Sequence, residues 1–264
     1  MLKYEFKKLF GKRKGIVLLA LFIGFLAFCA VVISRIVPEM RAGYFSEEEL
    51  FSRYGEVFGG FLTYVQMIVV AVTASLFPME FTNNMSEIAM SSKYGKNKLV
   101  STKIIMALLL GNGITISYII VFLIGYFSIF GFDFNIPIVA GWELDYLVDP
   151  DVRTQGDCLI REIFGTWLIG NFLLLLSLLV SQKTKKAFST SVIVIVSGLA
   201  LTFMPGDNPV MDLSPFCFSY RPSTYKELFM IGETSVTALD IGYVVYIILI
   251  LLLLIRIKSA SKVK

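Results

Sequence analysis

Long apolar stretches alternate with short polar connections along this chain. Six of these stretches reach about 17 residues or more, which is long enough for a helix to cross a hydrocarbon layer of roughly 30 Å. The pattern therefore predicts six transmembrane helices within one domain at residues 15–257. The predicted spans are residues 15–37, 57–77, 104–130, 163–180, 187–204 and 241–257.

The stretches are predicted to be helices because lipid offers the backbone no hydrogen-bond partner. A closed barrel is the other solution, but its strands alternate apolar and polar residues, whereas residues 249–255 are apolar throughout. The first stretch is too long for a cleaved signal peptide, and five more follow it. The fold class predicted is an all-α integral membrane protein.

Composition and charge support a multi-pass topology. The chain is 56% hydrophobic and only 17% charged, against about 25% charged residues in soluble proteins. Of 24 Lys and Arg residues, 17 fall in residues 1–14, 78–103, 181–186 and 256–264, and 17 of 20 Asp and Glu residues fall elsewhere. Basic connections stay in the cytoplasm, so both termini are predicted to be cytoplasmic. The net charge of +4 conceals this polarity and does not indicate nucleic-acid binding.

Residues 1–14 have helical amphipathic spacing. Leu2, Phe6, Leu9 and Phe10 fall on one face, and the lysines fall elsewhere. Such a helix lies in the membrane interface and contacts anionic lipids. The alternative is a basic cap that only sets topology.

Residues 80–103 form a cytoplasmic connection that is long for a link between two helices. Asn83 or Asn84 can cap a short helix, which Gly95 would end. Its apolar face would suit docking into a groove of a partner protein. The alternative is a solvated loop with a basic charge run.

This connection resembles a known family. Glu80 closes the second span, a Ser-Ser-Lys-Tyr-Gly-Lys turn follows at residues 91–96, and Lys103 opens the third span. This order is similar to the type-2 permeases of bacterial ABC exporters, although many members have Gly-Thr where this chain has Asn84-Met85. The resemblance implies a coupling helix that docks on a separate ATPase subunit. It also implies that the chain lies in a plasma membrane of the bacterial type. The docking residues implied are Glu80, Met85, Glu87, Ile88, Ser92, Tyr94, Gly95, Lys96 and Lys103.

Two larger connections are predicted on the outer side. Residues 131–162 are acidic, and residues 205–240 are rich in aromatic residues. Thr224 and Glu227 have the spacing of a capping box, and Gly232 could stop a short helix after Phe229. The family resemblance also implies a re-entrant or interfacial helix here; an ordinary aromatic belt is the alternative.

Cysteines are few. Cys158 and Cys217 both fall in predicted outer connections, so a disulfide between these two connections is one hypothesis.

Several kinds of chemistry are excluded. The chain has no histidine, which removes His-ligated zinc and Ser-His catalysis. It has no P-loop pattern, so any ATP and Mg would bind the partner subunit, and no cofactor, metal site or enzyme activity is predicted for this chain. The middle of each span is neutral, which argues against an ion-coupled carrier. Neutral polar residues within spans either line a path or join helices; the path candidates are Thr63, Gln66, Thr73 and Asn112.

Two functional hypotheses follow. The first is the membrane subunit of an ABC exporter, as a homodimer or heterodimer with two ATPase subunits, which moves an apolar or amphipathic substrate out of the cell. Small hydrophobic peptides, such as bacteriocins, are the first candidate substrates. The second is a non-transporting membrane protein, such as an assembly factor, an immunity protein or a sensor.

Overall fold

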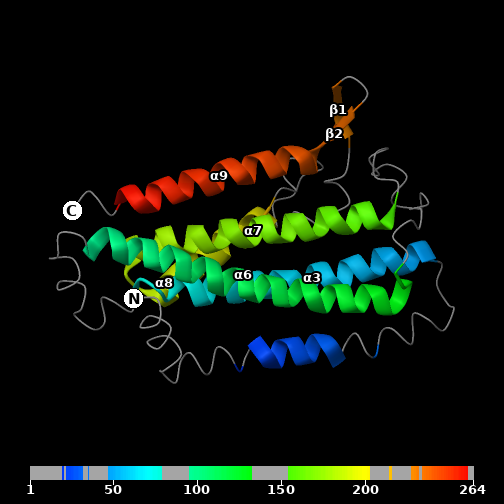
Figure 1. The fold of residues 1–264 in the computed structure, drawn as a ribbon, viewed down its shortest axis with the longest axis horizontal. Helices are drawn as coiled ribbons and strands as arrows, with labels where there is room; N and C mark the ends of the chain where they lie inside the picture. Colours follow the sequence, from blue (N-terminus) through cyan, green and yellow to red (C-terminus); the bar gives the residue numbers. More distant parts are fainter. Residues whose placement is uncertain are drawn as a thin grey trace.

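The structure is a computed structural model that describes most of the helical part of the chain. The described residues are 20, 22–31, 35, 47–78, 95–132, 154–202, 214–215, 227–231 and 234–260. They are almost entirely helical, as the sequence predicts. The labelled elements of Figure 1 are α3 (Glu47–Ala74), α6 (Gly95–Phe130), α7 (Gln155–Thr184), α8 (Ala187–Thr202), β1 (Glu227–Ile231), β2 (Thr234–Thr237) and α9 (Ala238–Ala260).

Three of the described helices, α6, α7 and α9, are long and apolar enough to cross a membrane. They contain the predicted spans 104–130, 163–180 and 241–257. Shorter apolar helical stretches in the described part occur at Phe22–Val31, Gly60–Ala74 and Ala187–Ala200. The long helices indicate a membrane protein.

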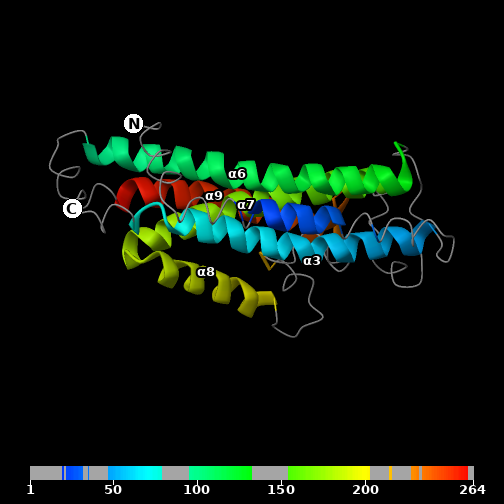
Figure 2. The same ribbon diagram turned by 90° about the horizontal axis from the view of Figure 1, so that it is seen from below.

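The helices form an elongated bundle around α7, which packs against α3, α6, α8 and α9. Helices α3, α7 and α9 run in one direction, and α6 and α8 run in the other (Figures 1 and 2). We call the end at which α3 ends and α6 begins the inner end. The turn from α7 to α8 and the end of α9 lie at the same inner end. The opposite end is called the outer end.

Apolar side chains cover the outside of this bundle. Ile124 on α6 is 62% exposed and Ile255 on α9 is 63% exposed, and both helices present further aliphatic residues in the same way. Exposed apolar surface of this extent is unusual for a water-soluble monomer. The exposed aliphatic residues of α6 and α9 include Ile105, Leu109, Ile116, Ile120, Val244, Ile248, Leu251 and Leu252.

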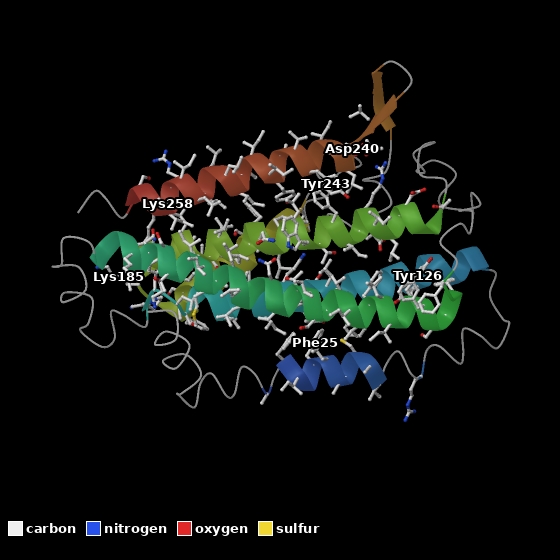
Figure 3. All side chains as sticks on the ribbon, in the orientation of Figure 1. Phe25, Tyr126, Lys185, Asp240, Tyr243 and Lys258 are labelled. Carbon is white, nitrogen blue, oxygen red and sulfur yellow. The ribbon has the colours of Figure 1, made fainter. Side chains whose placement is uncertain are left out.

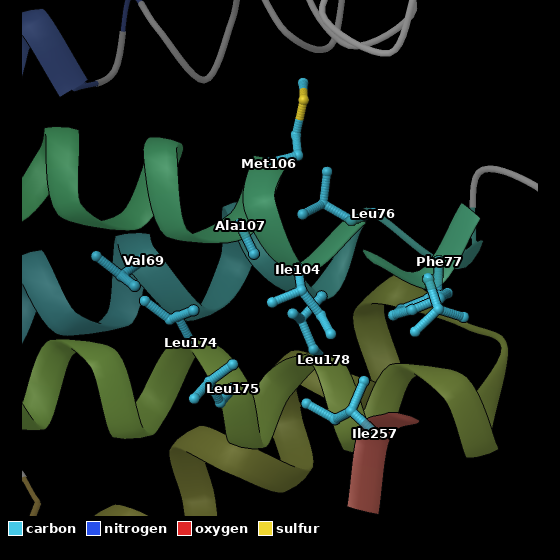
Figure 4. Packing of buried hydrophobic residues seen from close by; sticks show 11 residues of the cluster. Val69, Leu76, Phe77, Ile104, Met106, Ala107, Leu174, Leu175, Leu178 and Ile257 are labelled. Carbon is cyan, nitrogen blue, oxygen red and sulfur yellow. The ribbon is translucent and has the colours of Figure 1, made fainter. Parts of the chain in front are cut away.

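The interior near the inner end is also apolar. Val69 of α3, Ile104 of α6 and Leu174 of α7 belong to one buried cluster, which Ile257 of α9 joins (Figure 4). Burial of each such side chain contributes roughly 1.5–3 kcal/mol in water; inside lipid the gain comes chiefly from close packing.

The predicted helix after Thr224 is wrong over its described part. Residues 227–231 and 234–237 instead form an antiparallel hairpin in which Phe229 pairs with Val236 and Ile231 with Thr234. Both segments are rich in β-branched and large apolar residues, which favour strands. Two residues including a glycine separate them, which is typical of a hairpin. This strand preference outweighs the capping pattern.

The predicted outer connection 131–162 is shorter than expected because α7 begins at Gln155. The Thr154 hydroxyl accepts a hydrogen bond from the Asp157 backbone N–H at 3.2 Å and donates to the Asp157 carboxylate at 2.8 Å. This contact caps the helix start. Helix α9 begins with the same arrangement, formed by Thr237 and Asp240.

Two glycines allow α6 and α7 to approach closely. A Cβ atom built on Gly111 would lie 2.9 Å from Leu174 Cδ2, and one built on Gly170 would lie 3.0 Å from Thr115 Oγ1. By contrast, a Cβ atom on Gly113 would meet nothing within 4 Å. The contact between α6 and α7 therefore depends on the first two glycines and not on the third.

We expect Gly111→Val to lower the thermal unfolding midpoint of the detergent-purified chain. The added side chain would displace Leu174, and overpacking of this kind costs about 1–3 kcal/mol. Gly113→Val, two residues away on the same helix, is the control and should change stability by less than about 0.5 kcal/mol. Equal loss of stability in both variants would contradict the close approach at Gly111.

Candidate functional site

Polar side chains connect the three central helices through the interior of the bundle. Asn112 of α6 and Asn171 of α7 form a reciprocal pair, in which each amide nitrogen lies 3.1 Å from the other side-chain oxygen. The Asn112 nitrogen also donates to the Leu108 carbonyl at 2.9 Å, and the Asn171 nitrogen donates to the Trp167 carbonyl at 2.8 Å. Each amide therefore uses both of its N–H groups.

A second polar contact joins α3 to α7. The hydroxyl groups of Thr73 and Ser177, both fully buried, are hydrogen-bonded to each other. Thr73 is also 2.7 Å from the Val69 carbonyl, and Ser177 donates to the Leu174 carbonyl at 2.8 Å. Of the path candidates, Thr73 and Asn112 thus make helix–helix contacts in this structure.

Gln66 differs from these residues. Its side chain is only 2% exposed, and neither its amide nitrogen nor its amide oxygen has a hydrogen-bond partner among the described residues. Thr63, one helical turn outward on α3, is half-buried. Sequence reasoning selected Gln66 as a polar residue in a span, but only the structure shows that its amide lacks a protein partner.

The position of Gln66 follows from its neighbour Val69. A Cβ atom built on Gly111 would lie 3.5 Å from Val69 Cγ1 and close to Leu174. Gln66 is one turn outward from Val69 on α3. Thr115 lies one turn outward from Gly111 on α6, and Asn171 lies one turn outward from Leu174 on α7. We call Gln66, Asn112, Thr115 and Asn171 the polar layer.

The predicted docking residues lie mostly outside the described part of the chain. These residues are Glu80, Met85, Glu87, Ile88, Ser92 and Tyr94. Gly95 was expected to end a short helix, but it is the first residue of α6, and Lys96 follows it in the same helix. Lys103 does not open the helix of the third span; it lies inside α6, fully buried.

Polar contacts at the outer end tie α7 to α9. The Arg161 guanidinium lies 3.4 Å from the Asp240 carboxylate, and the Tyr243 hydroxyl donates to the Arg161 carbonyl at 2.7 Å. Figure 3 shows Asp240 and Tyr243 at this end, and Lys185 and Lys258 at the inner end. The sequence carries no signal for this pairing, because the two charges are far apart along the chain.

An aromatic cluster joins α3 to α6 at the outer end. The Tyr54 hydroxyl donates a hydrogen bond to the Phe122 carbonyl, and its ring contacts Tyr126 and Phe130 edge-on. Burial raises the pKa of Tyr54 well above its ordinary value, and the nearby Tyr118 hydroxyl and Glu162 carboxylate act in the same direction. Tyr54 therefore stays protonated and remains a donor.

Cys158 was expected in an outer connection, but it lies within α7 as a buried thiol. Cys217, its predicted disulfide partner, lies outside the described residues. The disulfide therefore stays a prediction. Within the described residues, no group of three Cys, Asp or Glu side chains is placed to hold a metal ion.

Comparison with known proteins does not assign this chain to a family. The sequence matches no protein-family model and no curated protein. Function must therefore be argued from the chain itself.

The asparagine pair can be tested by a double-mutant cycle. Asn112→Leu or Asn171→Leu alone should lower the free energy of unfolding by about 1–3 kcal/mol, because the remaining buried amide loses its partner. The double variant should lose less than the sum of the two single losses. Thermal unfolding in detergent gives the three values. Additive losses would show that the pair is not formed.

Proposed function

We propose that this chain is the membrane-spanning permease subunit of an ATP-driven exporter with six spans. The three long apolar helices account for three of the six predicted spans. The three shorter apolar helical stretches fall within the other three, residues 15–37, 57–77 and 187–204. This one-to-one correspondence supports the six-span arrangement.

The observation that carries the proposal is the position of the basic segments. The connection between α3 and α6, the turn from α7 to α8 and the end of α9 all attach to the inner end of the bundle (Figure 1). The corresponding segments 78–103, 181–186 and 256–264 hold 11 of the Lys and Arg residues. A single basic end supports a cytoplasmic inner face.

The proposed docking of an ATPase on the connection between α3 and α6 rests on the family resemblance and agrees with this orientation. The connection joins two helices that pack against each other and against the central α7. A force applied to it would move α3 and α6 relative to α7 directly. Two permease copies, or this chain with a similar one, and two ATPase subunits that bind ATP and Mg would form the working complex.

The proposed cargo is apolar or amphipathic, and small hydrophobic peptides are the first candidates. The polar groups between α3, α6 and α7 that carry the helix contacts are neutral amides and hydroxyls. Neutral groups at these helix contacts do not favour a strongly charged cargo, because a charge inside the membrane is costly without a partner. Export as the direction rests on the family resemblance.

The docking proposal predicts that an ATPase subunit co-purifies with this chain in mild detergent and loses binding when the connection is changed. Met85→Asp and Glu87→Lys alter its proposed apolar face and its acidic residue. We expect both variants to lose most of the bound ATPase and of the ATP hydrolysis measured in the complex. Lys258→Gln, at the exposed inner end of α9, is the control and should retain both.

Two outcomes of this experiment would contradict the proposal, and each has a different meaning. If the variants retain the ATPase, the docking site lies elsewhere on the inner face. If the unaltered chain carries no ATPase, it belongs to the non-transporting class, such as an assembly factor, an immunity protein or a sensor.

Topology gives an independent prediction. In a chain from which Cys29, Cys158 and Cys217 have been removed, Lys93→Cys should react with a membrane-impermeant maleimide only after the cells are opened. Asp151→Cys should react in intact cells, because its connection joins the outer ends of α6 and α7. Reaction of both cysteines from the same side would overturn the proposed orientation.

A further inference from the structure

The buried amide of Gln66 lacks a hydrogen-bond partner within the described protein. Leaving a buried donor or acceptor unsatisfied costs about 1–3 kcal/mol, and native structures rarely leave such groups unpaired. Gln66 has both deficits at once, because neither its nitrogen nor its oxygen has a partner among the described residues. A glutamine held this way in an apolar bundle points to a partner beyond the described part of the chain.

The rest of the polar layer cannot donate a hydrogen bond to the Gln66 oxygen in this arrangement. Asn112 and Asn171 already use all four of their amide N–H groups, in their mutual pair and in bonds to backbone carbonyls. The Thr115 hydroxyl donates its hydrogen to the Gly111 carbonyl at 3.0 Å. None of these three side chains has a hydrogen left for the Gln66 oxygen.

The charged residues of α3, α6 and α7 lie away from the polar layer. Along α3, α6 and α7, the nearest ionisable Lys, Arg, Asp and Glu residues to the polar layer are Glu162 and Lys103. Glu162 is nine residues outward from Asn171, and Lys103 is nine residues inward from Asn112. At 1.5 Å per residue, each charge lies about 13 Å from the layer along the helix axis. No charge at the layer compensates a charged ligand.

We propose that Gln66 is a binding site for a neutral group that accepts and donates hydrogen bonds together. Such a group would accept from the Gln66 nitrogen and donate to its oxygen, as an amide or a water molecule does. The source is either solvent water or a peptide amide of the cargo. The cargo source rests on the proposed export function, whereas the site itself does not.

The chain offers a direct spectroscopic test because it contains only three glutamines, at positions 66, 155 and 182. Labelling the glutamine side chains with 15N in detergent micelles gives three NH2 signals. Gln66→Met, which keeps the side-chain length without the amide, identifies the signal of Gln66 by its loss. Gln155, at the outer end of α7, serves as the internal reference. Gln182, at the inner end, is not a reference, because its amide oxygen also lacks a hydrogen-bond partner among the described residues.

The probe is N-methylacetamide, the smallest peptide-bond mimic. We expect the Gln66 NH2 signal to show a nuclear Overhauser effect to water, or a saturable shift with N-methylacetamide that the Gln155 reference does not share. A water contact without a saturable shift assigns the site to solvent. A saturable shift with loss of the water contact assigns it to an amide ligand.

Two results would overturn the site. One is a Gln66 signal with neither a water contact nor a saturable response. The other is a scalar coupling across a hydrogen bond from the Gln66 side-chain amide to another group of the chain, which would place its partner inside the chain. The isolated chain suffices for this test, so absence of an ATPase partner would remove only the cargo source and leave the site standing.

Discussion

Hydrogen bonding without water is the constraint on which this bundle depends. The outside of α6 and α9 is aliphatic, so polar side chains are stable only where another helix or a carbonyl of their own helix can bind them. Asn112 and Asn171 meet this requirement together, and Thr73 meets it with Ser177. The same contacts hold α3 and α6 against α7, so the hydrogen bonds that pair these buried polar groups also pack the helices together.

The hydrophobic pattern predicted the existence of α6, α7 and α9 because span length and apolar composition are local properties. It predicted their ends less well. Hydropathy marks where lipid begins, and a helix continues past that point if its backbone bonds remain favourable. Helix α6 accordingly begins at Gly95, nine residues before the predicted span, and α3 begins ten residues early at Glu47.

A local capping pattern does not decide on its own whether a helix forms. Thr154 with Asp157 and Thr237 with Asp240 have capping spacing and do begin helices. Thr224 with Glu227 has the same spacing, yet residues 227–231 form a strand. The candidate site shows a different limit. Composition identified Gln66 and Asn112 as polar residues within spans, but whether each has a partner depends on contacts between distant helices.

The unbroken length of α6 has a mechanical consequence. Its 36 residues extend about 54 Å, well beyond the roughly 30 Å hydrocarbon thickness. A rigid rod of this length acts as a lever: rotation by about ten degrees around its middle displaces each tip by about 5 Å, in opposite directions. The tip at Gly95 directly follows the connection from α3, whereas the tip at Phe130 lies near the aromatic cluster. Motion imposed at one surface would therefore reappear, reversed, at the other.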